Sequence, residues 1–525
     1  MKTIVISEQV SDDDKTRGFI AHICGNLKSR FPDGHYYIPD PADISDYKYQ
    51  LQGTEKVVIA GGGYAGALAA MALLKENPSL DVTIVEARSP TRCVGGPCTC
   101  KGCMGGVSSK GIEMIRSLGI EFPDDLFTGQ AAHIGYVNVR ENIGLDKVEP
   151  KATPELKFIS HGFGPAALQL GTRGQKISMA DFLRSEAKKR GVKIVTGAVT
   201  HIAFPEYRSH PAYVRYETGS SGNILDAELV INATGVNGRG LDLMRYHPNP
   251  DNGEIIPGKI LSPAPATHFA SVFEIPITDQ QVADLKMSPH VFYYWYGVPN
   301  TEAILTMLKR SHGEQWVTVV VSPKPKLMRD ANSDDERKQK IGTIFRSFLE
   351  MSGMGKFVGD RMLCQCLSKI PVDVTIFPGV RNYPGHRYVM VGDASGVIRY
   401  KKSGIAYLIE CAFIIANTAV TCGVTGDSLA SSHDVFAANV HADNLVGQFL
   451  FAASCVVNRS PFLSRMYGAM LNVSFVGDAV GRVVMGHTGL DARYATSLPV
   501  AVWRRLRGMK EESPPRKQGP NNLHL

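Results

Sequence analysis

The stretch that decides the fold lies at residues 56–86 and reads KVVIAGGGYAGALAAMALLKENPSLDVTIVE. A short apolar run leads into a glycine-rich turn at residues 61–66. A segment rich in Ala and Leu, typical of a helix, follows the turn, and a second β-like run ends in Glu86. This order predicts a βαβ unit of the kind that binds a dinucleotide. The alternative is a turn that packs a helix and binds nothing, and it leaves Glu86 unexplained.

Each position in this unit has a physical role if a dinucleotide lies there. Gly61 permits the tight turn, Gly63 lets the backbone approach a pyrophosphate, and Gly66 lets the helix pack close to the sheet. The first helical turn offers N–H groups and the positive end of the helix dipole to the phosphates. Glu86 follows Gly66 by 20 residues, where a carboxylate accepts hydrogen bonds from ribose hydroxyls. The expected cofactor contacts are Gly61, Gly63, Tyr64, Ala65, Gly66, Glu86, Ala87 and Arg88.

The composition is that of an ordinary globular protein. The chain has 525 residues, of which 44% are hydrophobic and 20% are charged, so we expect two or three packed regions and no extensive disorder. The net charge is +7, but the Lys and Arg residues are scattered, which argues against binding to nucleic acid. Residues 1–52 precede the βαβ unit and are interpreted as an accessory segment.

Three segments bear on the location of the protein. Ser7 and Glu8 end a short apolar run at the start of the chain, so we expect no signal peptide and a cytoplasmic protein with reduced cysteines. Residues 404–423 have the length of a membrane span, but Glu410 and several polar residues favour a helix buried in the protein. The basic stretch at residues 503–510 is either a solvated tail or a peripheral contact with the inner face of a membrane.

Two further pieces of sequence accompany the βαβ unit. The strand-like run at residues 229–232 ends in Ala233-Thr234-Gly235, and small residues at a strand end leave room for a cofactor. A second strand-like run, at residues 387–394, ends in Gly392-Asp393-Ala394 and precedes an apolar helix. In this order the three pieces resemble the FAD-dependent oxidoreductases built like p-hydroxybenzoate hydroxylase.

The resemblance implies that the second motif holds the ribityl and pyrophosphate part of FAD. Ribityl hydroxyls need an acceptor, which the carboxylate of Asp393 supplies, and the following helix points its N-terminus at the flavin. The additional FAD-binding residues implied by the resemblance are Gly235, Gly392, Asp393, Gly396, Gly404 and Ile405.

Within that class the chain is most similar to the geranylgeranyl reductase family, over roughly residues 55–500. The loop CMGGVS at residues 103–108 matches the family's Cys-x-Gly-Gly-Leu-Ser type loop. The stretch YWYGVP at residues 294–299 resembles its aromatic-Pro strand with one residue inserted, and GHTGLDARY at residues 486–494 is similar to its C-terminal region. The resemblance places Cys103, Gly105, Gly106 and Trp295 at the catalytic site.

The implied activity is hydride transfer from reduced FAD to an isolated C=C bond of a prenyl chain or another apolar substrate. The electrons would come from NADPH, ferredoxin or an electron-transfer flavoprotein. Such a substrate needs an apolar tunnel. The candidates to line it are Phe292, Tyr293, Trp295 and Trp316, each equally suited to the core of a sheet. The sequence does not name the alkene, the electron donor or the oligomeric state.

The predicted fold class is α/β, with a Rossmann-type FAD-binding domain, an inserted antiparallel-sheet substrate domain and a helical C-terminal region. We assign residues 53–120, 176–240 and 385–425 to the FAD-binding domain, residues 121–175 and 241–384 to the substrate domain, residues 426–510 to the helical region and residues 511–525 to a flexible tail. The substrate sheet is expected from strand-like runs at residues 290–299, 303–309 and 314–323, and residues 199–230 alternate like a hairpin.

Four cysteines depart from the pattern of the reductase family, which has one cysteine in its loop. Cys93, Cys98, Cys100 and Cys103 lie within eleven residues of chain, so they are candidate ligands for an iron–sulfur cluster or a zinc ion. The alternative is that Cys103 serves the flavin site while the other three are reduced thiols or a redox pair.

Three other functions remain open at this point. An electron-transfer-flavoprotein:quinone type oxidoreductase would relay electrons through a cluster held by the cysteines. A flavin monooxygenase or halogenase shares the fold, although the Trp-x-Trp-x-Ile-Pro pattern of the halogenases is absent, since residues 294–296 read YWY. A flavin-bearing scaffold subunit is the non-catalytic alternative.

Overall fold

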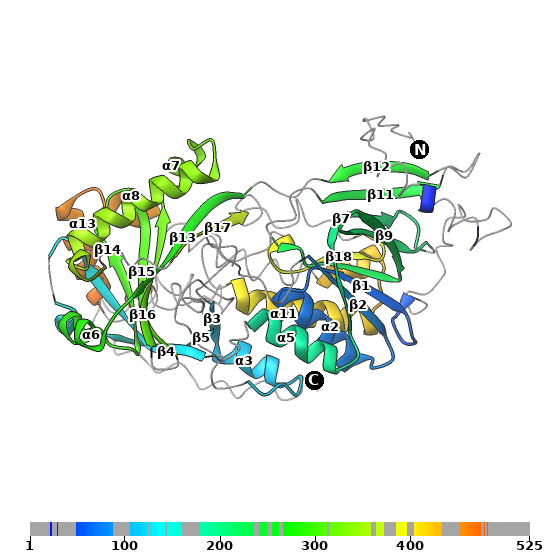
Figure 1. Ribbon diagram of the computed structural model, residues 1–525, viewed down its shortest axis with the longest axis horizontal. Helices are drawn as coiled ribbons and strands as arrows, with labels where there is room; N and C mark the ends of the chain where they lie inside the picture. Colours follow the sequence, from blue (N-terminus) through cyan, green and yellow to red (C-terminus); the bar gives the residue numbers. More distant parts are fainter. Residues whose placement is uncertain are drawn as a thin grey trace, which may run out of the picture. The chain divides into compact units, whose positions relative to one another are not determined.

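The structure is a computed structural model (Figure 1). It describes residues 21–23, 29, 49–87, 105–122, 127–141, 144–159, 179–208, 210–235, 241–248, 255–261, 266–311, 314–358, 364–371, 385–395, 404–432, 452–473, 477 and 480. Their strands form three sheets, with five, five and eight strands.

The first sheet is parallel and contains the βαβ unit. Its strand order is β18 (Tyr388–Met390), β10 (Leu229–Asn232), β1 (Lys56–Ala60), β2 (Asp81–Glu86) and β6 (Lys193–Thr196). β1 and β10 are rich in Val and Ile and almost fully buried, as expected for parallel strands covered on both faces. β1 has β2 on one side and β10 on the other, so the strand order reverses at β1. Open α/β sheets bind ligands at such a switch point.

Two different layers cover the two faces of the parallel sheet. Val57 and Ile59 contribute to a core shared with helices α2 (Tyr64–Glu76), α5 (Met179–Lys189) and α11 (Gly404–Thr421). Val58 and Ala60 contribute to a core shared with the second sheet, because successive side chains of a strand point to opposite faces. The three helices lie beside β1 and β2 in Figure 1. The predicted α/β fold class is confirmed.

The second sheet has the order β12 (Ile255–Leu261), β11 (Asp242–Pro248), β7 (Ala198–Pro205), β8 (Ala212–Thr218) and β9 (Ser221–Ala227). β8 and β9 form the antiparallel hairpin that the sequence predicted. β11 and β12 differ from their expected place in the substrate domain, because β11 pairs in parallel with β7. The layer over the parallel sheet therefore extends beyond the predicted boundary at residue 240.

The third sheet has the order β17 (Cys364–Pro371), β13 (Ala266–Pro276), β16 (Glu314–Pro323), β15 (Thr301–Ser311), β14 (Val291–Tyr296), β4 (Phe127–Asn138), β5 (Lys151–Ile159) and β3 (Gly105–Ser108). The antiparallel pairing of β14, β15 and β16 confirms the predicted sheet. Helix α8 (Asp334–Ser352) packs on one face, here named the α8 face (Figure 1). Helix α13 (Pro461–Asn472) packs on the other, named the α13 face, through Tyr467 and Leu471.

Shorter elements connect these layers. They are the helices α3 (Ser109–Arg116), α6 (Asp279–Leu285), α7 (Pro325–Arg329) and α9 (Gly355–Val358), and the single turns η4 (Leu145–Lys147) and η6 (Gly392–Ser395). α11, the apolar segment with the length of a membrane span, is buried against α2 as predicted. No helix in the described part of the chain combines the length and hydropathy that crossing a bilayer requires.

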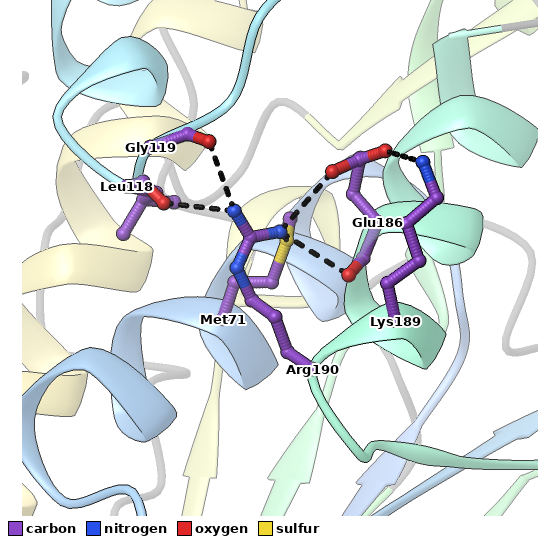
Figure 2. Close-up of polar contacts among 6 residues, drawn as sticks. All are labelled: Met71, Leu118, Gly119, Glu186, Lys189 and Arg190. Atoms are coloured by element: carbon purple, nitrogen blue, oxygen red, sulfur yellow. Dashed lines mark hydrogen bonds and ion pairs between the residues drawn. The ribbon is translucent and has the colours of Figure 1, made fainter.

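Arg190, directly after α5, ties three helices together (Figure 2). Its Nη2 donates hydrogen bonds to the carbonyl oxygens of Leu118 and Gly119, just beyond α3, at 2.9 and 3.2 Å. Its Nη1 donates to the backbone oxygen of Glu186 at 3.1 Å and lies 3.4 Å from the sulfur of Met71 in α2. Because α3 follows β3 directly, this contact holds β3 and α3 against the helices of the parallel sheet.

Candidate dinucleotide site

The turn after β1 has a backbone that only glycine adopts without strain. Gly61 has a φ of +101°, and a Cβ added there would lie 2.5 Å from the carbonyl oxygen of Ala233. The Gly61 N–H donates to the carbonyl oxygen of Val85 at 2.8 Å. Gly61 therefore lies in close contact with the ends of both β2 and β10, as expected for the first glycine of the motif.

Gly66 and Gly63 differ in what surrounds them. A Cβ on Gly66 would lie 1.9 Å from the Gly61 carbonyl oxygen, so this glycine allows α2 to pack against the end of β1. A Cβ on Gly63 would meet no atom of the described residues within 4 Å. Gly63 is also the N-cap of α2, and among the described residues no side chain caps that terminus and no acidic residue lies in its first turn. Open space before an uncapped helix N-terminus is what a pyrophosphate needs.

Glu86 lies at the tip of β2, beside this open space. Its Oε2 accepts a hydrogen bond from the Gly62 N–H at 2.6 Å. The carboxylate is partly exposed, and Ala87 after it is exposed. A partly exposed carboxylate at this strand tip is in position to accept from ribose hydroxyls.

Arg184 of α5 binds the other polar backbone group of Gly62, a contact that the sequence did not predict. It is buried, and its Nη1 donates to the Gly62 carbonyl oxygen at 2.7 Å. Its Nη2 pairs with the carboxylate of Asp181. Burial, and then the negative charge of Asp181, raise the pKa of Tyr64 well above its ordinary value, so Tyr64 stays neutral at the start of α2.

The second sequence motif reaches the same edge of the sheet. Gly392, at φ +63°, begins η6, and a Cβ there would lie 3.1 Å from the Cβ of Ala65 in α2. Asp393 follows and is partly buried. Burial raises the pKa of Asp393 to about 6. Two motifs separated by more than three hundred residues therefore meet beside the glycine turn.

The end of β10 lies at the same edge of the parallel sheet as the glycine turn. Asn232 donates from Nδ2 to the hydroxyl of Tyr388 at 3.0 Å, and its Oδ1 accepts from the Thr234 hydroxyl at 2.8 Å. Gly235 has a φ of +69° with nothing within 4 Å of its Cβ position. Asn232 and Tyr388 fix the strand end, and the sequence missed both because the hydrogen bond joins residues 156 positions apart in the chain.

Comparison with known proteins supports this reading of the fold. No protein-family model matches the chain. The solved structure of FqzB is 14% identical and covers 89% of this chain and 99% of its own, with a TM-score of 0.51. A salicylate hydroxylase with bound substrate is 13% identical and covers 82% and 98%, with a TM-score of 0.50. The chain has the Rossmann-type fold of the FAD-binding oxidoreductases.

Two further proteins are similar to this chain. CtdE, solved with FAD and a substrate, is 14% identical over 77% of this chain and 90% of its own, with a TM-score of 0.50. The flavoprotein chain of the flavocytochrome c sulfide dehydrogenase of Chlorobaculum thiosulfatiphilum is 49% identical over 37 residues, which is 7% of this chain and 77% of that protein's sequence. That length is close to one βαβ unit.

The remaining predicted flavin residues are placed only in part. Gly404 and Ile405 begin α11, whose Cys411 lies beside Gly392. Burial raises the pKa of the Cys411 thiol to about 12, so it is an inert packing residue. Arg88 and Gly396 lie outside the described residues, and their roles stay predictions.

The predicted catalytic residues are not brought together by the described part of the chain. Gly105 and Gly106 lie in β3, paired with Ile159 and Phe158 of β5. Trp295 lies in the core on the α8 face, with its ring 5.2 Å from that of Phe348 and its Nε1 donating to Thr306 at 2.7 Å. A packed indole with a satisfied N–H is typical of a core residue.

The cysteine prediction is untested. Cys93, Cys98, Cys100 and Cys103 all lie outside the described residues. Among the residues that the structure does describe, no group of three or more His, Cys, Asp or Glu side chains is arranged to hold a metal ion.

The α13 face of the third sheet carries a group of aromatic side chains. Phe292, Tyr294 and Tyr296 of β14 lie on it together with Tyr136 of β4. Burial raises the pKa of Tyr294 well above its ordinary value. Farther along, Thr318 pairs with Met307, which belongs to the same face. Thr318 Oγ1 and Trp316 Nε1 are buried without a hydrogen-bond partner among the described residues.

Proposed function

We propose that this chain is an FAD-dependent oxidoreductase. The observation that carries the proposal is the meeting of Gly392 and Ala65, because it brings an acidic ribityl-type motif to an open glycine turn. The residues fit the cofactor on independent grounds: the space at Gly63 is empty and the N-terminus of α2 is uncapped. Neither feature is needed by a turn that only packs a helix.

Each residue at the edge then has a stated role. Gly63 and the first N–H groups of α2 bind the pyrophosphate, and Glu86 accepts from the ribose hydroxyls. Asp393 accepts from the ribityl hydroxyls, and Arg184 keeps the Gly62 peptide in the orientation that binding needs. Bound FAD would supply two-electron chemistry, as hydride transfer or as oxygen transfer when molecular oxygen takes part.

For the substrate we propose an apolar molecule of the isoprenoid type, whose C=C bond is reduced. This rests on the resemblance of the loop at residues 103–108 and the stretch at residues 294–299 to the geranylgeranyl reductases. Of the predicted lining residues, Phe292 lies in the core of the α13 face, whereas Tyr293 and Trp295 lie in the core of the α8 face. NADPH, ferredoxin or an electron-transfer flavoprotein would supply the electrons.

A hydroxylase is the second candidate, and a specific observation favours it. The Nε1 of Trp316 and the hydroxyl of Thr318 are buried donors on the α13 face. A prenyl chain is a hydrocarbon and has no acceptor for such donors, whereas a substrate with a carboxylate or carbonyl group has one.

One experiment separates the two candidates. The purified chain is loaded with FAD, reduced with dithionite without oxygen and incubated with a geranylgeranyl lipid. A product that has gained two hydrogens per C=C bond supports the reductase. If the lipid is not reduced, the reduced protein is mixed with an aromatic acid and oxygen. Rapid oxygen consumption and conversion of the acid to a product with one added oxygen atom support the hydroxylase. A chain that takes up no FAD under any condition overturns both. Iron and sulfide analysis of the same sample tests the cysteine cluster.

A further inference from the structure

The large apolar side chains that the described part of the chain exposes to solvent are all in one place. They are Val456, Phe462, Met466, Met470 and Val473. Phe462 is 67% exposed and Met466 is 56% exposed. Scattered single exposures are normal for a soluble protein, but a concentration within residues 456–473 marks a surface that another body covers.

The geometry of α13 turns these side chains into a stripe. Phe462, Met466 and Met470 are four residues apart, so they lie one above the other on the same face of the helix. Tyr467 and Leu471 on the other face are buried against the third sheet. Gly468 lies on the same buried side and packs closely on the sheet, because a Cβ there would lie only 2.3 Å from the Tyr296 hydroxyl. The stripe is therefore the side of α13 that faces away from the sheet.

The helical segment that carries the stripe has only positive charges of its own. Arg459 and Arg465 are the charged residues within residues 452–473, and both are exposed. Arg465 makes one long contact, 3.8 Å to the carboxylate of Glu141. A long side chain on the flank of an apolar stripe keeps its charge in water while its stem lies along the apolar surface.

The combination of an apolar stripe with flanking arginines indicates what kind of partner covers this surface. A second copy of the chain, docked stripe to stripe, would bring Arg459 and Arg465 near their own counterparts, which like charges oppose. A helix of 12 residues is also too short to cross a bilayer. The partner must accept apolar side chains and attract arginines. An anionic lipid surface does both.

We propose that α13 lies on an anionic membrane surface, with Phe462, Met466 and Met470 inserted among the lipid chains and Arg459 and Arg465 at the headgroups. The surface is distinct from the dinucleotide edge. Membrane docking is therefore independent of the flavin proposal and survives if that proposal fails. If the substrate is an isoprenoid lipid, the same surface places the enzyme where that lipid resides.

The test is flotation of the full chain with vesicles of phosphatidylcholine, with and without about 30% phosphatidylglycerol. We expect binding to the anionic vesicles, weakened by added salt. Phe462→Asp and Met466→Asp lower the bound fraction about tenfold or more, because each puts a charge where an apolar side chain inserts. Arg465→Glu weakens binding to anionic vesicles, while Arg346→Glu, the same change at an exposed site on α8, does not.

Three results overturn the proposal. One is a wild-type chain that stays with the soluble fraction on anionic vesicles. Another is a Phe462→Asp chain that floats as well as the wild type, since the binding surface then lies elsewhere, for example at residues 503–510. The third is light scattering that shows an oligomer which Phe462→Asp converts to a monomer, because the stripe is then an interface between copies. Flavin content and circular dichroism establish that each variant is folded.

Discussion

Arg184 of α5 donates a hydrogen bond to the carbonyl oxygen of Gly62 at 2.7 Å. Glu86 accepts from the N–H of the same residue at 2.6 Å. The glycine turn is thus held on both its polar groups by side chains from different elements. Both backbone polar groups of Gly62 are therefore paired within the protein, which restricts the conformations open to the turn.

Replacing Arg184 with Ala tests this contact. The change leaves the Gly62 carbonyl oxygen without its donor and the Asp181 carboxylate without its partner. We expect the free energy of unfolding of the cofactor-free chain to fall by about 1–3 kcal/mol, and the affinity for FAD to fall with it. Urea unfolding and flavin fluorescence titration measure the two effects.

The matched control is Arg116→Ala, an exposed arginine in the last turn of α3. It should change stability by no more than about 0.5 kcal/mol. If Arg184→Ala and Arg116→Ala behave alike in both measurements, the contact with Gly62 has no role in shaping the turn.

Because Arg190 contacts the end of α3, we expect Arg190→Ala to lower the free energy of unfolding much more than the neighbouring change Lys189→Ala. Arg190→Ala removes two hydrogen bonds to carbonyl oxygens just beyond α3, and we expect a loss of about 1–3 kcal/mol. Lys189→Ala removes an exposed pair with Glu186, worth at most about 0.5 kcal/mol. Thermal unfolding of both variants checks the prediction, and equal changes in melting temperature contradict it.

Asp393 gives the cofactor-free protein a specific dependence on pH. Its pKa rises from 3.8 to about 6 on folding, so the fold favours the protonated carboxyl. Below the pKa of the unfolded state, Asp393 is protonated in both states and does not destabilise the fold. As pH rises from the unfolded pKa to the folded pKa, the fold becomes less stable. Above about pH 6 the full destabilisation, on the order of 3 kcal/mol, is present.

The variant Asp393→Asn should therefore stabilise the cofactor-free chain at about pH 8 and lose most of that advantage near pH 4. It should also weaken FAD binding by about tenfold, because a charged acceptor makes the stronger hydrogen bond to a hydroxyl. Urea unfolding at several pH values and a FAD titration measure the two effects. A variant less stable than the wild type at about pH 8 contradicts the burial argument.

The sequence predicted those features of the site that depend on residues close together in the chain. Gly61 and Gly66 have steric roles that follow from the spacing alone, and the positions of the strands along the chain follow from the apolar runs. Arg184 was out of reach, because its partner Gly62 lies more than a hundred residues away and an arginine within a helix usually faces solvent.

The third sheet shows a different limit. Alternation of side chains predicts that Tyr294 and Trp295 lie on opposite faces, but not which face meets a substrate. The structure puts Trp295 against α8 and Tyr294 on the α13 face. The pairing of β11 with β7 was also unpredictable, since parallel pairing joins segments with no turn between them.

The most direct test of the central claim is FAD binding by Gly63→Ala. A Cβ there meets nothing within 4 Å, so the variant should fold as the wild type does, while the methyl group takes the space of the pyrophosphate. Gly342→Ala, in α8 and equally unhindered, is the matched control. We predict that the dissociation constant for FAD rises at least about tenfold in Gly63→Ala and is unchanged in Gly342→Ala. Equal FAD affinity of a folded Gly63→Ala chain and the wild type would contradict the account.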